Sequence, residues 1–139
     1  MFGLLGGDAN AIAPGKRMLS SMTPTIVVRD GHTWLVASSP GGGQIITTVL
    51  QVLVNAIDHR MNVQQAVDAP RFHHQWQPDK VQLEPLGVAA DVIGALEALG
   101  HTTHVDSDMG GVQAIVIEPG TGLRLGATDP REDGGAVGY

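Results

Sequence analysis

The segment QIITTVLQVLVNAIDH, from Gln44 to His59, limits the folds open to this chain more than any other part of it. Polar residues recur three or four positions apart, at Thr47, Gln51, Asn55 and Asp58, and most other positions hold Ile, Val, Leu or Ala. This spacing predicts a helix with one narrow polar stripe. Because most of its surface is apolar, the helix must be largely buried, and one hairpin is too small to cover it.

Stretches rich in β-formers lie on both sides of this helix. Thr25–Arg29 and Thr33–Ala37 flank Asp30-Gly31, which is a strong signal for a tight hairpin turn. A second hairpin is predicted within GVQAIVIEPGTGLRLGATD, with its turn at Pro119-Gly120. Each end of the chain therefore contributes a pair of antiparallel strands.

The middle of the chain predicts two more helices and two short strands. Asn62 can cap a helix at Val63–Val67, and a third helix covers about Ala89–Leu99, with an apolar face of Val88, Val92, Leu96 and Leu99. VQLE and THVDS each predict a strand, whereas residues 1–19, RFHHQWQPDK and REDGGAVGY predict irregular structure. Strands at both ends with helices between them indicate an α+β fold, with an antiparallel sheet and helices packed on it.

Composition narrows the class of protein. The 139 residues fit one domain, residues 1–139, and 42% hydrophobic residues can build a core. A net charge of −6 argues against a nucleic-acid surface, which needs clustered Lys and Arg. The absence of cysteine excludes disulfides and thiolate sites, and no apolar run is long enough to span a bilayer.

Three consecutive glycines, Gly41-Gly42-Gly43, open the apolar helix. The first N–H groups of a helix have no partner within it, and glycine lets an anion approach them closely. No Lys follows at the spacing of a phosphate-binding loop, which leaves two interpretations. One is an oxyanion hole with two backbone donors. The other is a tight turn that needs positive φ, and the motif alone favours this second interpretation.

Other polar residues carry weaker signals. Ser20-Ser21 could donate two hydrogen bonds to a carboxylate, or could form a local serine turn. The pairs His73-His74 and His101-x-x-His104 lack a third patterned ligand, so we expect no metal site and no cofactor. Asp106-Ser107-Asp108 is interpreted as an acidic turn, and Asp129-Pro130-Arg131 as a salt-bridged turn or an anchor for the tail.

The motifs PGKRMLSSMTPTIVVRDG, SSPGGGQIITTVLQ, DAPRFHHQW and ATDPR, in this order and with VGY at the end, resemble the C-terminal part of the small subunit of γ-glutamyltranspeptidases. The resemblance runs from Gly6 to Tyr139. It implies an N-terminal-nucleophile hydrolase with an αββα sandwich, made from a precursor that cleaves itself. An N-terminal threonine then acts as nucleophile and base on γ-glutamyl amides such as glutathione, and water or an amino acid or peptide accepts the γ-glutamyl group.

By this resemblance, Ser20 and Ser21 bind the donor's α-carboxylate, and the amides of Gly41 and Gly42 form the oxyanion hole. Residue 1 is Met, so the nucleophile and the large subunit are expected to be partners outside this chain, and the chain alone is expected to be inactive. It should also self-associate through apolar surface left uncovered. A periplasmic or secreted location is implied. The alternatives are a cephalosporin (glutaryl) acylase and a non-catalytic binding or structural module.

Overall fold

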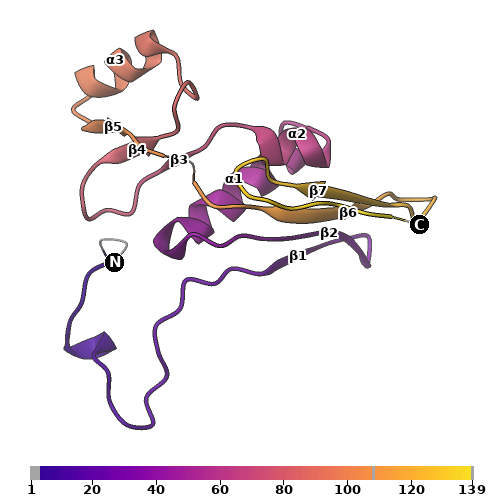
Figure 1. Cartoon of the computed structure of the whole chain (residues 1–139), viewed down its shortest axis with the longest axis horizontal. Helices are drawn as coiled ribbons and strands as arrows, with labels where there is room; N and C mark the ends of the chain where they lie inside the picture. The colour runs from indigo at the N-terminus through magenta and orange to yellow at the C-terminus, as the bar shows by residue number, and fades with distance from the viewer. Residues whose placement is uncertain (1–3, 108, 139) are drawn as a thin grey trace.

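A four-stranded antiparallel sheet forms the largest part of the computed structural model, which describes residues 4–107 and 109–138. Its strands lie in the order β1-β2-β6-β7 and comprise Thr25–Arg29, His32–Ser38, Gln113–Ile117 and Arg124–Thr128. Both predicted hairpins are therefore confirmed (Figure 1). Asp30 and Gly31 have φ angles of 51° and 79°, the double positive φ of a two-residue turn that matches the twist of its strands.

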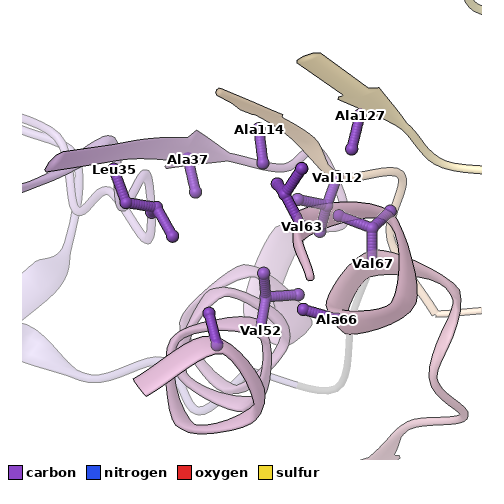
Figure 2. Close-up of a cluster of buried hydrophobic side chains, with 10 residues drawn as sticks. Leu35, Ala37, Val52, Val63, Ala66, Val67, Val112, Ala114 and Ala127 are labelled. Atoms are coloured by element: carbon purple, nitrogen blue, oxygen red, sulfur yellow. The ribbon is translucent and has the colours of Figure 1, made fainter. Parts of the chain in front are cut away.

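Two helices cover one face of this sheet. Helix α1 spans Ile45–Ile57 after a short 3₁₀ turn, η2, at Gly42–Gln44, and α2 spans Val63–Asp68. The predicted cap is confirmed, because the Asn62 side chain accepts a hydrogen bond from the Gln65 N–H. Figure 2 shows the core between the helices and the sheet, which is formed by Leu35, Ala37, Val52, Ala56, Val63, Ala66, Val67, Val112, Ala114 and Ala127.

Helix α1 is only partly covered within this chain, whereas its sequence predicted a largely buried helix that needs more than one hairpin to cover it. Ile46, Leu50 and Ile57 keep 53%, 55% and 42% of their surface exposed. The polar stripe meets neighbouring main chain: the Gln51 amide exchanges hydrogen bonds with the backbone of Phe72, and Asn55 donates to the Ala66 carbonyl. The apolar side of α1 that remains open is therefore a surface on which further structure can pack.

A second, smaller sheet contains β3 (Phe72–His73), β4 (Val81–Leu83) and β5 (Thr103–Val105). The sequence did not predict this separate sheet, and the prediction of irregular structure was wrong at Phe72 and His73, which pair with β4. Strands β4 and β5 are parallel, so the chain must cross over between them, and α3 (Ala90–Ala98) makes that crossover. Figure 1 shows this unit at one end of the large sheet. On the predicted apolar face of α3, Val92 and Leu99 are exposed.

The described residues before β1 form an extended arm that leaves the body of the molecule (Figure 1). Its one 3₁₀ turn, η1, is at Asp8–Asn10, and the remainder is irregular as predicted. Within the described part of the chain, no helix combines the length and the hydropathy needed to cross a bilayer. The α+β prediction is confirmed, with a mixed second sheet added to the antiparallel one.

Candidate active site

Gly41, Gly42 and Gly43, here called the glycine turn, lie between the end of β2 and the start of α1. Gly41 and Gly42 have φ angles of 128° and 58°, which residues with a side chain rarely adopt. Both positions therefore favour glycine for conformational reasons. The Gly41 carbonyl accepts a hydrogen bond of 3.1 Å from the Gln44 N–H. Among the hydrogen bonds of residues 4–107 and 109–138, none uses the N–H of Gly41 or Gly42. Two adjacent backbone donors are therefore available at this turn.

Of the serine pair at the end of the extended arm, Ser21 contacts this turn. The Ser21 hydroxyl donates a 2.6 Å hydrogen bond to the Gly42 carbonyl. The Ser20 hydroxyl accepts from the Met22 N–H at 3.2 Å, which is the local turn that its sequence context also allowed. The Ser21 hydroxyl therefore lies against the backbone of the turn that also carries the free N–H groups of Gly41 and Gly42.

A loop before β6, residues 109–112, packs directly on the glycine turn. Gly110 has a φ of 67°, and a Cβ added to it would lie 2.5 Å from the Ser39 Oγ and 3.2 Å from the Pro40 carbonyl oxygen. The Gly111 N–H donates to the Ser39 Oγ at 3.1 Å. Sequence reasoning missed this loop, although its adjacent glycines before a strand were a signal of close backbone approach.

A buried cluster of four charged side chains stands behind this loop. Asp129 accepts from Arg71 at 2.6 Å (Nη2 to Oδ2) and from Arg131 at 3.0 Å (Nη1 to Oδ1). Arg131 also donates twice to Glu84, at 2.7 Å and 2.6 Å. The two formal positive charges balance the two negative ones. The salt-bridged turn predicted at Asp129-Pro130-Arg131 is confirmed, whereas sequence reasoning missed Arg71 and Glu84.

The charged cluster anchors both ends of the loop at residues 109–112. The Met109 N–H donates to Glu84 at 2.8 Å, and the Met109 carbonyl accepts from Arg71 at 2.6 Å. At the other end, the Val112 N–H donates to Asp129 at 2.7 Å. The cluster therefore fixes the loop, and the loop in turn supports the glycine turn.

Hydrogen bonding keeps this cluster ionised. Burial works against charge on Glu84, but donors from Arg131, Met109 and Arg71 outweigh it and hold the pKa of Glu84 below its usual 4.5. The pKa of Asp129 is likewise below 3.8, because its backbone and arginine donors outweigh its burial. Burial lowers the pKa of Arg71, while the two carboxylates outweigh burial and raise that of Arg131. At neutral pH the cluster carries paired charges and has a supporting role.

The histidines are not gathered into a site. His73 is buried, with its Nδ1 at 2.7 Å from the Thr47 Oγ1 and its Nε2 at 2.8 Å from the Gln75 Oε1. The Nε2 of His74 lies 3.0 Å from the Oδ1 of Asp79. His101 and His104 are exposed. Within the described ranges, no group of three or more His, Cys, Asp or Glu side chains is arranged to hold a metal ion. In the predicted acidic turn, Asp106 accepts from the Ser107 N–H, and Asp108 lies outside the described residues.

Known proteins match the whole chain. The family model of γ-glutamyltranspeptidase covers residues 1–139. The glutathione hydrolase proenzyme of Escherichia coli is 54% identical over 140 residues, covering 100% of this chain and 24% of that protein. A mutant γ-glutamyltranspeptidase of Helicobacter pylori superposes with a TM-score of 0.91 and 51% identity, over 95% of this chain and 72% of that one.

A more distant match is an acylase. The cephalosporin acylase of Bacillus halodurans has a TM-score of 0.85 and 32% identity, over 93% of this chain and 24% of its own. The present chain thus spans about a quarter of the curated relative from Escherichia coli, and 72% of the solved chain from Helicobacter pylori. The fold described above is the one these proteins share.

Proposed function

The chain belongs to the γ-glutamyltranspeptidase family, and on that premise we propose that the complete protein cleaves glutathione and other γ-glutamyl amides. The γ-glutamyl group would pass to water or to an amino acid or peptide. The observation that carries the proposal is the hydrogen bond from the Ser21 hydroxyl to the Gly42 carbonyl, in the turn where the N–H groups of Gly41 and Gly42 are free.

Gly41 and Gly42 are proposed as the donors of the oxyanion hole. When a nucleophile adds to an amide carbonyl, the oxygen gains a negative charge, and it loses that charge when the amine leaves. Two fixed N–H groups stabilise this charge without reorganising, and loss of one such donor typically lowers the rate by about 10²–10³-fold. Their freedom from other hydrogen bonds supports this role.

Ser20 and Ser21 are proposed to bind the donor's α-carboxylate. A γ-glutamyl group is short, so the groups that hold its carboxylate must lie close to those that hold its carbonyl. The 2.6 Å bond between the Ser21 hydroxyl and the Gly42 carbonyl supports that proximity. On substrate binding, the hydroxyl would exchange this carbonyl for the carboxylate, a charged and stronger acceptor.

The remainder of the active site is proposed to come from outside these 139 residues. We propose that residues 1–139 fold as one domain, that the N-terminal threonine nucleophile and the large subunit join it, and that the complete protein is periplasmic or secreted. The exposed apolar residues Ile46, Leu50 and Ile57 on α1 support this proposal, because they form a surface on which a partner can pack. On its own, the chain should not turn over a γ-glutamyl anilide.

A glutaryl-specific acylase is the second candidate, because an acylase shares the fold at 32% identity. It ranks below the first because the γ-glutamyltranspeptidase of Helicobacter pylori is 51% identical. The two activities differ in their need for the substrate's α-amino group, which a glutaryl group lacks. Comparing γ-glutamyl and glutaryl anilides on the complete protein separates them.

The test of the carboxylate role uses the complete protein with Ser20 and Ser21 both changed to Ala. Loss of the two hydroxyl donors should raise KM for γ-glutamyl anilide about 10²–10⁴-fold, since each hydrogen bond to a charged group contributes about 1.5–3 kcal/mol and about 1.4 kcal/mol is tenfold. For a 4-aminobutyryl anilide, which has no carboxylate, kcat/KM should not change. Ser38→Ala, at an exposed position, is the control. A double variant that loses activity equally on both substrates would contradict the role.

A further inference from the structure

We propose that Ser39 is a positioning residue for the oxyanion hole, because its buried hydroxyl fixes the peptide that carries the Gly41 N–H. The inference rests on the proposed function, since it concerns the same backbone donors. It adds a side chain that touches neither the substrate nor the reacting atoms, and that sequence reasoning had not singled out.

The Ser39 hydroxyl joins two main-chain segments. It donates to the Pro40 carbonyl at 2.6 Å and accepts from the Gly111 N–H at 3.1 Å. The directions are settled, because a carbonyl can only accept and an N–H can only donate. Ser39 is 8% exposed; its bond with the Gly111 N–H is buried, and its bond to the Pro40 carbonyl is partly buried.

Holding the Pro40 carbonyl also orients the Gly41 N–H. The two groups belong to one planar trans peptide, in which C=O and N–H point in opposite directions. A bond that pins the oxygen therefore fixes the direction of the hydrogen. In the next peptide, the Gln44 N–H holds the Gly41 carbonyl at 3.1 Å and orients the Gly42 N–H in the same way.

The two donors differ in how they are held. The Gly42 donor is fixed by main chain alone, whereas the Gly41 donor depends on a side-chain hydroxyl. Gly41 has a φ of 128° and no Cβ, so this peptide has little intrinsic resistance to rotation. The backbone of Gly110 closes over the hydroxyl, because a Cβ there would lie 2.5 Å from the Ser39 Oγ. Ser39→Ala would thus remove the donor that holds the Pro40 carbonyl and leave the buried Gly111 N–H without its acceptor.

The experiment compares Ser39→Ala with Ser38→Ala in the complete protein. The second variant removes the same hydroxyl from the adjacent, exposed position. Loss of a full oxyanion donor lowers kcat by about 10²–10³-fold, so a misdirected donor should lower it by about 10–100-fold. KM for γ-glutamyl anilide should stay within about 2-fold, because the carboxylate contacts are intact and the missing interaction belongs to the transition state.

A boronic acid analogue of glutamate supplies a readout that a purely structural role would not move. It forms a tetrahedral anion on the nucleophile, so Ser39→Ala should weaken its inhibition about 10-fold while leaving the affinity for glutamate unchanged. A kcat within 2-fold of the wild type would overturn the proposal. So would a parallel loss of boronate and glutamate affinity that follows a fall in Tm. If Ser39→Ala does not fold, Ser39→Cys retains a weak donor and should give a smaller fall in kcat with unchanged KM.

Crystal structures of the two variants separate this inference from the proposed function. In Ser39→Ala, the Pro40–Gly41 peptide should rotate or occupy two orientations, and in Ser38→Ala it should not move. An unrotated peptide in Ser39→Ala overturns the positioning role whatever the enzyme's substrate. A wild-type protein that does not cleave γ-glutamyl anilide refutes the proposed function, and the peptide orientation still decides the role of Ser39.

Discussion

Replacing Asp129 with Asn should test how strongly the charged cluster holds this fold together. Asp129 is fully buried, and its two oxygens accept four hydrogen bonds. Arg71 and the Val112 N–H bind one oxygen, while the N–H and the guanidinium of Arg131 bind the other. An Asn side chain has the same shape but only one accepting oxygen, and its NH₂ group would face two donors.

The size of the effect follows from these contacts. Two of the four hydrogen bonds are lost, and each donor left unpaired in a buried place costs about 1–3 kcal/mol. The cluster also loses one negative charge and retains both arginines, and breaking a buried ion pair from one side typically costs about 3–5 kcal/mol. We therefore expect the free energy of unfolding to fall by about 3–5 kcal/mol, which is a large share of the stability of an ordinary domain.

The assay is urea unfolding of the 139-residue chain at low concentration, followed by tryptophan fluorescence and by circular dichroism. Coincidence of the two transitions checks that unfolding is two-state. The matched control is Asp133→Asn, at an exposed position near the same end of the chain, which should change the free energy by less than about 0.5 kcal/mol. A loss below 1 kcal/mol for Asp129→Asn, or an equal loss for the control, would refute the reasoning.

Two further predictions concern the same chain. Because the folded-state pKa values of Glu84 and Asp129 are lowered, their contribution to stability is complete above about pH 4.5 and is lost as the pH falls through their lowered pKa values. The urea midpoint should then be steady from about pH 7 to pH 5 and drop below about pH 4, with a smaller drop in Asp129→Asn; equal drops would contradict this assignment. The isolated chain should also form dimers or larger species in sedimentation velocity, because Ile46 and Leu50 on α1 stay exposed, and a monomer at high concentration would count against it.

The apolar surface that should cause self-association also includes the face of the large sheet away from the helices. Ile26, Val36 and Ile115 are cross-strand neighbours on this face. They remain 65%, 38% and 44% exposed. The alternation along β2 puts Leu35 and Ala37 into the core and Val36 on the opposite face, so both sides of the sheet are apolar. A sheet of this kind suits the interior of a layered structure.

Local signals were sufficient for most of the individual elements. Asp30-Gly31 specified a hairpin because few other pairs tolerate positive φ twice, and Asn62 specified a helix start because its side chain can accept from a backbone N–H. The polar stripe of α1 predicted one helix face correctly. It gave no indication that Gln51 would bond to the main chain at Phe72, because that partner depends on tertiary packing.

Features that join distant parts of the chain could not be predicted from the sequence. To predict the parallel pairing of β4 with β5, one must know that α3 is a crossover. Short strands also carry too little sequence pattern to show which strands they pair with. Nothing in the sequence singled out Arg71 and Glu84, since only the fold brings them to Asp129 and Arg131. For the candidate site, sequence indicated the serines and glycines but not Ser39, whose importance lies in which carbonyl it bonds.

The contacts that secure the glycine turn also bear on the order in which the chain folds. Arg71 and Asp129 are 58 positions apart, Glu84 and Arg131 are 47 apart, and Ser39 and Gly111 are 72 apart. Contacts of such separation form only after long loops have closed, whereas the hairpins and α1 need only near neighbours. The elements around the turn should therefore be in place before the turn acquires its final geometry. Substitutions in the cluster or at Ser39 should accordingly speed unfolding more than they slow folding, because their contacts are absent from an early transition state.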